Sequence, residues 1–224
     1  MRISACVFDA YGTLLDVHAA VRRYSARIGP AADAMSALWR TKQLEYTWVR
    51  SLMGRHADFA TVTAEALDHA IAVHAIPADA ALRADLLAAY RELDSFGDAR
   101  ETLTALRKAG LKTAILSNGT PEWLDAAARA AKIDGLLDAI WSIESVGIYK
   151  PDPRVYRLAT EGLGLAAGQI GFVSSNPWDG AAAAANGFQA VRVNRTSGPA
   201  EYAAIVAVPE VRALAALPAH FGVG

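Results

Sequence analysis

Short apolar runs alternate with amphipathic stretches over much of the chain. The apolar runs cover residues 3–8, 113–116, 139–143, 170–173 and 190–193. Each run is too short for a helix of its own and is typical of a strand buried in a parallel sheet. Between the later runs, helical patterns cover residues 99–109, 121–131, 153–162 and 178–186. This alternation predicts an α/β fold with a doubly wound parallel sheet, whose strands are joined by crossover helices.

Residues 16–96 differ from the rest of the chain because they show helical periodicity without a convincing strand. We therefore expect residues 16–96 to form an inserted helical cap subdomain. Residues 1–15 and 97–224 would then form the α/β core domain, and the length of the chain is compatible with such a division.

The longest helix of the predicted cap covers residues 31–53. Apolar side chains recur along it at helical spacing and predict a packing stripe, formed by Met35, Trp39, Tyr46, Val49 and Met53. Arg40 and Leu44 lie one turn apart on a neighbouring face of the same helix.

A second cap helix is expected after Phe59, with Thr61 or Thr63 as the residue that caps its first turn. Pro77 separates this helix from a third one over residues 80–93.

The composition is that of a folded globular protein. Of 224 residues 53% are hydrophobic, and the 22 Lys and Arg nearly balance the 23 Asp and Glu. Because no basic block could follow a phosphate backbone, nucleic acid is not an expected partner. The apolar run before Asp9 is too short for a signal peptide or a membrane span. The single cysteine, Cys6, cannot form an intrachain disulfide, so we expect an inert core thiol and a cytoplasmic protein.

Polar residues gather where the predicted strands end. The first strand is followed by the loop of residues 9–13, the second by Ser117 and Asn118, and the fourth by residues 174–176 with Asp179 shortly after. Lys150 stands just before the helix over residues 153–162. Because ligands bind at the carboxyl ends of the strands in such sheets, we expect these segments to form one pocket.

Asp9 can be interpreted in two ways from the residues alone. A carboxylate at the end of a buried strand often caps a helix or anchors a loop. A nearby cation such as Lys150 favours the ionised carboxylate, which is the form that acts as a nucleophile.

Four segments, in order, resemble the haloacid dehalogenase superfamily and, within it, the (S)-2-haloacid dehalogenases. They are FDAYGT (residues 8–13), LWRTKQLEY (38–46), KPDPRVY (150–156) and SSNPWD (174–179). The Ser117, Asn118 and Gly119 strand end also fits the superfamily pattern, and the resemblance covers nearly the whole chain. It implies a Rossmann-like core with an inserted cap.

The resemblance also implies an activity. The aspartate that matches Asp9 attacks carbon 2 of an (S)-2-haloalkanoic acid, displaces the halide with inversion and forms an ester. Hydrolysis of that ester then gives an (R)-2-hydroxyalkanoic acid without a cofactor or a metal ion. The resemblance further suggests a homodimer formed through the helical part.

Site residues are carried over position by position. The catalytic set comprises Asp9, Thr13, Arg40, Ser117, Asn118, Lys150, Tyr156, Ser174, Asn176 and Asp179. The substrate and halide pocket comprises Ala10, Tyr11, Arg40, Leu44, Phe59, Ser117, Asn118 and Trp178. Arg40 and Asn118 would stabilise the halide, and Ser117 the substrate carboxylate. Asp179 would position or activate water, through Lys150 or alongside it. Each of these residues also has an ordinary structural interpretation, such as a surface arginine, a core aromatic or a local turn bond.

Two features argue against a phosphatase of the same superfamily. Such enzymes carry a second aspartate two residues after the nucleophile, where this chain has Tyr11, a poor proton donor at neutral pH. They also use acidic residues in the last motif to hold magnesium, where this chain has Ser174, Ser175 and Asn176 before Asp179. The phosphatase remains the alternative enzyme, and a non-catalytic binding protein is the alternative outside enzymes.

The remaining residues change this picture little. The histidines His18, His56, His69, His74 and His220 fall outside the catalytic segments, so a histidine base or a zinc site has little support. Thr41 and Pro177 depart from the pattern of the (S)-2-haloacid dehalogenases, and they bear on substrate preference more than on reaction type.

Overall fold

A parallel sheet of six strands forms the centre of the computed structural model, which describes residues 2–77 and 79–223. The strands are β1 (Ala5–Phe8), β2 (Lys112–Ser117), β3 (Ala139–Ser142), β4 (Ile170–Ser174), β5 (Gln189–Val193) and β6 (Glu210–Val211). They lie in the order β3-β2-β1-β4-β5-β6. The predicted α/β fold with a doubly wound, Rossmann-like sheet is confirmed. Strand β6 was not predicted, because two residues show no periodicity and only the pairing with β5 defines them.

The register of the central strands brings their polar ends together. Phe8 of β1 pairs with Ile115 of β2 on one side and with Val173 of β4 on the other. Asp9 and Ser174, the next residues along, therefore lie at the same level, at the carboxyl edge of the sheet. This edge is where an open parallel sheet binds its ligands.

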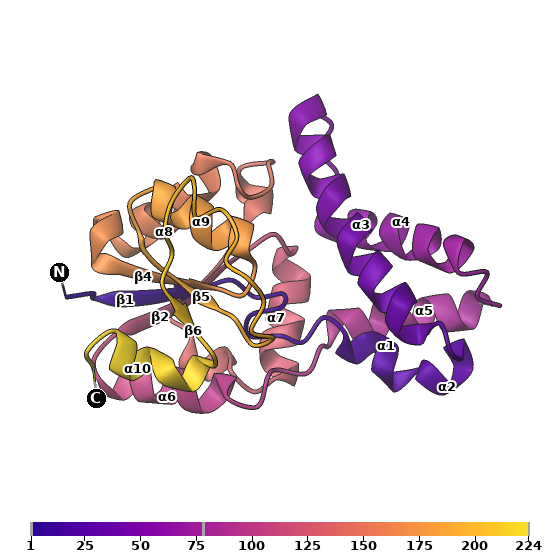
Figure 1. Cartoon of the computed structure of the whole chain (residues 1–224), viewed down its shortest axis with the longest axis horizontal. Coiled ribbons are helices and arrows are strands. Elements are labelled where there is room, and N and C mark those ends of the chain that lie inside the picture. The colour runs from indigo at the N-terminus through magenta and orange to yellow at the C-terminus, as the bar shows by residue number, and fades with distance from the viewer. Residues whose placement is uncertain (1, 78, 224) are drawn as a thin grey trace.

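Helices cover both faces of the sheet. They are α6 (Ala99–Lys108), α7 (Pro121–Ala130), α8 (Pro153–Leu163), α9 (Pro177–Ala185) and α10 (Leu217–His220). In Figure 1, α8 and α9 lie above the sheet, and α6 and α10 lie below it. The four predicted helices match α6 to α9 to within one residue at each end. Short 3-10 helices occur at Asp134–Leu136, Ile143–Ser145, Ala167–Gln169 and Leu214–Ala216.

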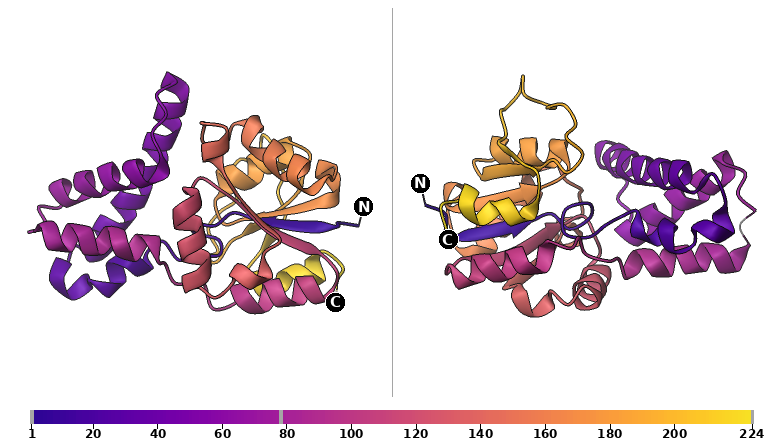
Figure 2. Two further views of the ribbon diagram at one scale, coloured as in Figure 1. Left: turned by 180° about the vertical axis from the view of Figure 1, so that it is seen from behind. Right: turned by 60° about the horizontal axis from the view of Figure 1, so that its bottom comes forward.

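The segment between β1 and α6 is helical and lies beside the sheet (Figures 1 and 2). Its helices are α1 (Ala19–Arg23), α2 (Ser25–Ile28), α3 (Ala32–Met53), α4 (Phe59–Val73) and α5 (Ala80–Arg91). We call these five helices the cap. The two chain segments that link it to the core run side by side, since the N–H of Asp16 donates to the carbonyl of Asp94 at 2.9 Å and that of Phe96 to Leu14 at 2.9 Å. The domain boundaries expected at residues 15/16 and 96/97 fall at these links and stay a prediction.

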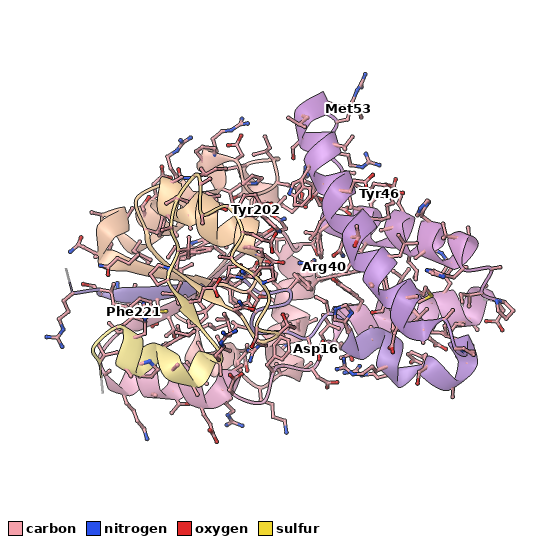
Figure 3. All side chains as sticks on the ribbon, viewed as in Figure 1. Asp16, Arg40, Tyr46, Met53, Tyr202 and Phe221 are labelled. Atoms are coloured by element: carbon pink, nitrogen blue, oxygen red, sulfur yellow. The ribbon has the colours of Figure 1, made fainter. Side chains whose placement is uncertain are left out.

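The predicted stripe on α3 is only half correct. Met35 and Trp39 are buried, as expected, but Val49 is 44% and Met53 61% exposed. The last turns of α3 extend past α4, and Figure 3 places Met53 at their free end. Apolar spacing alone could not show where the partner helix begins.

The prediction of the residue that caps the first turn of α4 is wrong. Asp58 takes this position, and its carboxylate accepts a hydrogen bond from the N–H of Thr61 at 2.7 Å. The helix therefore starts at Phe59, and Thr61 and Thr63 both lie inside its first turns.

The far end of the cap also touches the core. The hydroxyl of Tyr149 donates to the carbonyl of Ala57 at 2.7 Å, and His56 lies 2.9 Å from the carboxylate of Glu144. The indole rings of Trp48 and Trp178 meet edge to face at 5.4 Å. The cap is thus held at its two links and again at the end of α3.

Cys6 lies fully buried in β1, and burial raises the pKa of its thiol. This agrees with an inert core cysteine. None of the helices in the described part of the chain has both the length and the hydropathy required to cross a membrane.

Replacing Asp58, the residue that caps the first turn of α4, should lower stability without changing the site. We expect Asp58→Ala to lower the free energy of unfolding by about 1 kcal/mol, because the first turn of α4 loses its side-chain acceptor. Thr61→Ala is the matched control, since its exposed side chain caps nothing, and it should change stability by less than about 0.5 kcal/mol. Urea denaturation of both variants measures the difference, and equal free energies of unfolding would contradict the assignment of Asp58 as the capping residue.

Candidate active site

Asp9 is held at the end of β1 by its own loop. The N–H of Asp9 donates to the carbonyl of Val173 at 2.9 Å, and the following loop turns back through Gly12, whose φ of +94° favours glycine. This turn brings the hydroxyl of Thr13 to the Oδ2 atom of Asp9 at 3.0 Å. The amide NH2 of Asn176 donates to the same oxygen at 2.8 Å. One carboxylate oxygen of Asp9 therefore has two fixed donors.

Lys150 links two carboxylates inside the protein. Its side chain is 0% exposed, and Nζ lies 3.2 Å from Oδ1 of Asp9 and 2.9 Å from Oδ2 of Asp179. The ammonium also faces the ring of Phe172, 5.0 Å from its centroid. The hydroxyl of Tyr156 donates to Oδ1 of Asp179 at 2.6 Å. The two oxygens of Asp179 thus each have a donor.

Burial controls the protonation of the polar groups around this pair. It raises the pKa of Asp179, as does the charge of Asp9, while Lys150 and Tyr156 oppose this rise. Burial also raises the pKa of Tyr156 and of Tyr11 well above the usual range. Both phenols therefore stay neutral, and Tyr11 cannot replace the carboxylic acid that a phosphatase has at its position.

The polar residues after β2 and β4 have different partners. The carbonyl oxygen of Asn118 accepts the backbone N–H of Lys150 at 3.1 Å, which leaves its NH2 group as the donor for a ligand. The Oγ of Ser117 accepts the N–H of Gly119 at 3.2 Å. The Oγ of Ser174 accepts the N–H of Asn176 at 3.1 Å, and the side chain of Asn176 in turn contacts Asp9.

Arg40 reaches this site from the cap, as Figure 3 shows. Its Nη2 atom donates to the carbonyl of Tyr11 at 3.1 Å and to the side-chain oxygen of Asn176 at 3.3 Å. Its Nη1 atom donates to the side-chain oxygen of Gln43 at 2.7 Å. A cation of the cap therefore lies next to the nucleophile candidate of the core.

A narrow cavity lies between the cap and the strand ends. Its volume is about 10 Å³, close to that of one water molecule. It is lined by Asp9, Tyr11, Arg40, Leu44, Phe59, Ser117, Asn118, Asn176 and Trp178. Every predicted pocket residue except Ala10 is in this lining. Ala10 is fully buried, and its carbonyl instead accepts the N–H groups that close the loop after Asp9.

Aromatic rings form the apolar wall of the cavity. The rings of Tyr11 and Phe59 lie 4.9 Å apart. Gly119 is required beside them, because a Cβ there would lie 2.7 Å from the ring of Tyr11. In the described part of the chain, the buried hydroxyl of Tyr11 has no hydrogen-bond partner.

The donor set does not fit the magnesium ion that phosphatases of this fold would use. Tyr11 is a neutral phenol at the position of the second aspartate of those enzymes, and the residues before Asp179 are neutral as well. Within residues 2–77 and 79–223, no group of three or more His, Cys, Asp or Glu side chains is placed to hold a metal ion.

Sequence reasoning missed the residues behind Arg40. Gln43, Thr63 and Tyr90 are all buried and form one hydrogen-bonded group with Arg40. Gln43 lies within the segment of residues 38–46, so its polar side chain on a packed helix was the available signal. Tyr90 comes from α5, far along the chain, and no pattern connects it with the site.

Comparison of the sequence with known proteins shows the family of the chain. Residues 3–187 match the model of the haloacid dehalogenase-like hydrolases. The chain is 49% identical to (S)-2-haloacid dehalogenase 4A of Burkholderia cepacia, over 89% of this chain and 87% of that protein. It is 48% identical to (S)-2-haloacid dehalogenase 1 of Pseudomonas sp. (strain CBS-3), over 96% of this chain and 95% of that protein.

A solved structure has the same fold over nearly its whole length. The L-2-haloacid dehalogenase of Xanthobacter autotrophicus with chloropropionic acid covalently bound matches with a TM-score of 0.88 and 36% identity, over 97% of both chains. The sequence and the fold therefore agree, and the chain belongs to the haloacid dehalogenase-like hydrolases and, within them, to the (S)-2-haloacid dehalogenase family.

Proposed function

We propose that this protein hydrolyses (S)-2-haloalkanoic acids to (R)-2-hydroxyalkanoic acids with inversion, through an ester on Asp9. The observation that carries this proposal is the pairing of Asp9, whose Oδ2 has two fixed donors, with Arg40 on the lining of the same cavity. The names of the two bacterial relatives and the covalently bound chloropropionic acid of the Xanthobacter enzyme support it.

In the first step, Oδ1 of Asp9 attacks carbon 2 of the substrate. A carbon–oxygen bond forms, the carbon–halogen bond breaks, and the halide leaves with the electron pair. Charge grows on the halide in the transition state, so fixed donors around it lower the barrier. The Arg40 guanidinium and the NH2 group of Asn118 supply them in the cavity. Ser117 and the N–H groups of Ala10 and Tyr11, which are not among those that close the loop, hold the substrate carboxylate.

In the second step, water attacks the carbonyl carbon of the ester. Oδ2 becomes the ester carbonyl oxygen, and Thr13 and Asn176 stabilise the charge that develops on it. Asp179 accepts the proton from water, because the Lys150 ammonium has no lone pair and the raised pKa makes Asp179 a stronger base. The bond between the Asp9 carbonyl carbon and the substrate oxygen then breaks, and that oxygen takes the proton back from Asp179. Asp9 keeps the oxygen of water and loses the second proton to solvent, so both carboxylates are restored with no change at the inverted carbon.

A phosphatase reaction fits this site poorly. It needs a proton for the departing alcohol and a divalent cation for the phosphoryl group. Tyr11 stays neutral and buried where the proton donor would be, and neutral Ser174, Ser175 and Asn176 stand where acidic ligands would hold the cation. A halide leaves without a proton, so both features favour the dehalogenase reaction.

A second copy of this chain is the proposed protein partner. Near the free end of α3, Leu52 is 89%, Met53 61% and Val49 44% exposed. Leu52 also lines an apolar groove of about 790 Å³ between α3 and the core, together with Trp48, Tyr149, Trp178, Tyr202 and Ile205. Exposed apolar surface of this kind marks association sites. We further place the protein in the cytoplasm, in keeping with its single buried thiol.

The reaction is tested by halide release from each enantiomer of 2-chloropropionate in excess chelator. We expect release from the (S) form only, with (R)-lactate as the product on chiral chromatography. Asp9→Asn should slow release more than about a thousandfold, because the nucleophile is lost. Chelator-sensitive phosphate release from phosphate esters, without halide release, would instead establish the phosphatase.

The role of Asp179 predicts a change in pH dependence. Tyr156→Phe removes a hydrogen bond that lowers the pKa of Asp179. That pKa should rise, and the acidic limb of the kcat profile should move to higher pH, because the base is protonated over a wider range. An acidic limb that stays in place would contradict the assignment of Asp179 as the base. Tyr149→Phe, which removes a buried hydroxyl outside the site, is the control.

The partner surface predicts an oligomeric state. Sedimentation velocity should find a dimer for the unchanged protein and a shift toward monomer for Leu52→Glu, because a buried unpaired charge is costly at an apolar interface. Thr61→Glu, an equal change of charge at an exposed position of α4, should leave the dimer intact. A monomeric unchanged protein would refute this part of the proposal.

A further inference from the structure

Gln43 is an uncharged amide buried among the cap helices. Its side chain is 0% exposed, on the face of α3 that packs against α4 and α5. Its oxygen accepts from Nη1 of Arg40 at 2.7 Å and from the hydroxyl of Tyr90 at 3.0 Å. Its NH2 group donates to the Oγ1 atom of Thr63 at 2.6 Å. A buried amide is costly unless it is bonded, and here both its ends are bonded.

The hydrogen bonds of this group permit one orientation of the amide. The hydroxyl of Thr63 donates its single hydrogen to the carbonyl of Phe59 at 2.6 Å, so it can only accept from Gln43. The NH2 group of Gln43 must therefore face Thr63, and its oxygen must face Arg40 and Tyr90. Both of these are donors, since burial raises the pKa of the Tyr90 phenol and keeps it neutral. The side-chain oxygen is thus fixed by α4 and α5 before Arg40 binds to it.

The orientation of the Arg40 guanidinium depends on this fixed oxygen. An arginine side chain loses much rotamer freedom when it is held in one position. The core holds only Nη2, through Tyr11 and Asn176, whereas Gln43 holds Nη1 from the cap side. With contacts on both sides, the planar guanidinium is kept in one orientation at the cavity.

We propose that Gln43 is a positioning residue, which aims the Arg40 guanidinium at the leaving halide. This inference rests on the proposed dehalogenation. It assigns to Gln43 a part in carbon–halogen cleavage and none in ester hydrolysis, because Gln43 contacts neither Asp9 nor Asp179. Loss of this orientation should slow chloride release more than bromide release, since chloride is the poorer leaving group and needs more stabilisation in the transition state.

The test compares single-turnover halide release from (S)-2-chloropropionate and (S)-2-bromopropionate. Gln43→Leu keeps the side-chain size but removes the acceptor, and we expect the bromide to chloride rate ratio to rise about tenfold. Thr47→Val is the matched control. Thr47 is also buried in α3, one turn after Gln43, but its hydroxyl bonds only the carbonyl of Leu44. Its substitution should leave the ratio unchanged.

A double variant shows whether Gln43 acts through Arg40. In an Arg40→Ala background, Gln43→Leu should leave the ratio where Arg40→Ala alone puts it. An additional rise there, or equal slowing of both substrates by Gln43→Leu alone, would overturn the proposal. If the unchanged protein releases no halide, the proposed function fails, which is distinct from an active protein whose ratio does not respond.

A second variant keeps the proposal testable if Gln43→Leu does not fold. Tyr90→Phe removes one of the two donors to the Gln43 oxygen and leaves the Arg40–Gln43 hydrogen bond itself in place. It should raise the bromide to chloride ratio about two- to threefold, as expected for one neutral hydrogen bond. An unchanged ratio in a folded Tyr90→Phe variant would refute the positioning role.

Discussion

The buried ammonium of Lys150 is the constraint on which the rest of the site depends. A charge that is 0% exposed must be paired within the protein, and both of its partners are carboxylates that are themselves buried. Asp9 ends β1 and Asp179 lies in the first turn of α9, so the ion pairs tie the centre of the sheet to a helix on its face. Removal of the Lys150 charge would leave two buried carboxylates without a cation. The same pairing keeps Asp9, the proposed nucleophile, next to a cation.

The site is assembled from two parts of the chain that meet at the carboxyl edge of the sheet. The core supplies the carboxylates, Lys150 and the donors around Asp9, while the cap supplies Arg40 and much of the apolar wall. Hydrogen bonds from Arg40 to Tyr11 and Asn176 cross this junction, and contacts of Tyr149 and Trp48 hold the end of α3. The distance between Asp9 and Arg40, the proposed nucleophile and halide donor, is therefore set by the packing of the cap on the core and by no single loop.

Much of this arrangement was predictable from the sequence, for physical reasons that can be named. Parallel strands are buried on both faces and appear as apolar runs, so β1 to β5 were visible, and their shared edge implied that Asp9, Asn118 and Asn176 meet. Features defined by tertiary contacts were not visible. Strand β6 exists only through its pairing with β5, and the exposure of Val49 and Met53 depends on where α4 begins. Gln43 and Tyr90 meet across two helices, and no local spacing encodes that contact.

The charges of the site also account for its choice of reaction. In this fold, a second carboxylate after the nucleophile and a divalent cation would support phosphoryl transfer. Here, a neutral buried phenol, Tyr11, takes the place of that carboxylate, and neutral side chains precede Asp179 where acidic ligands of the cation would be. Tyr11 is a poor proton donor for the alcohol that leaves a phosphate ester, and neutral side chains do not bind the cation that would hold the phosphoryl oxygens. A halide requires only fixed donors, and the proposed ones are Arg40 of the cap and Asn118 of the core. Tyr11 stands in the core where a phosphatase has an acid, and Arg40 enters the same cavity from the cap. The two residues together suit the site to carbon–halogen cleavage, and neither suffices alone.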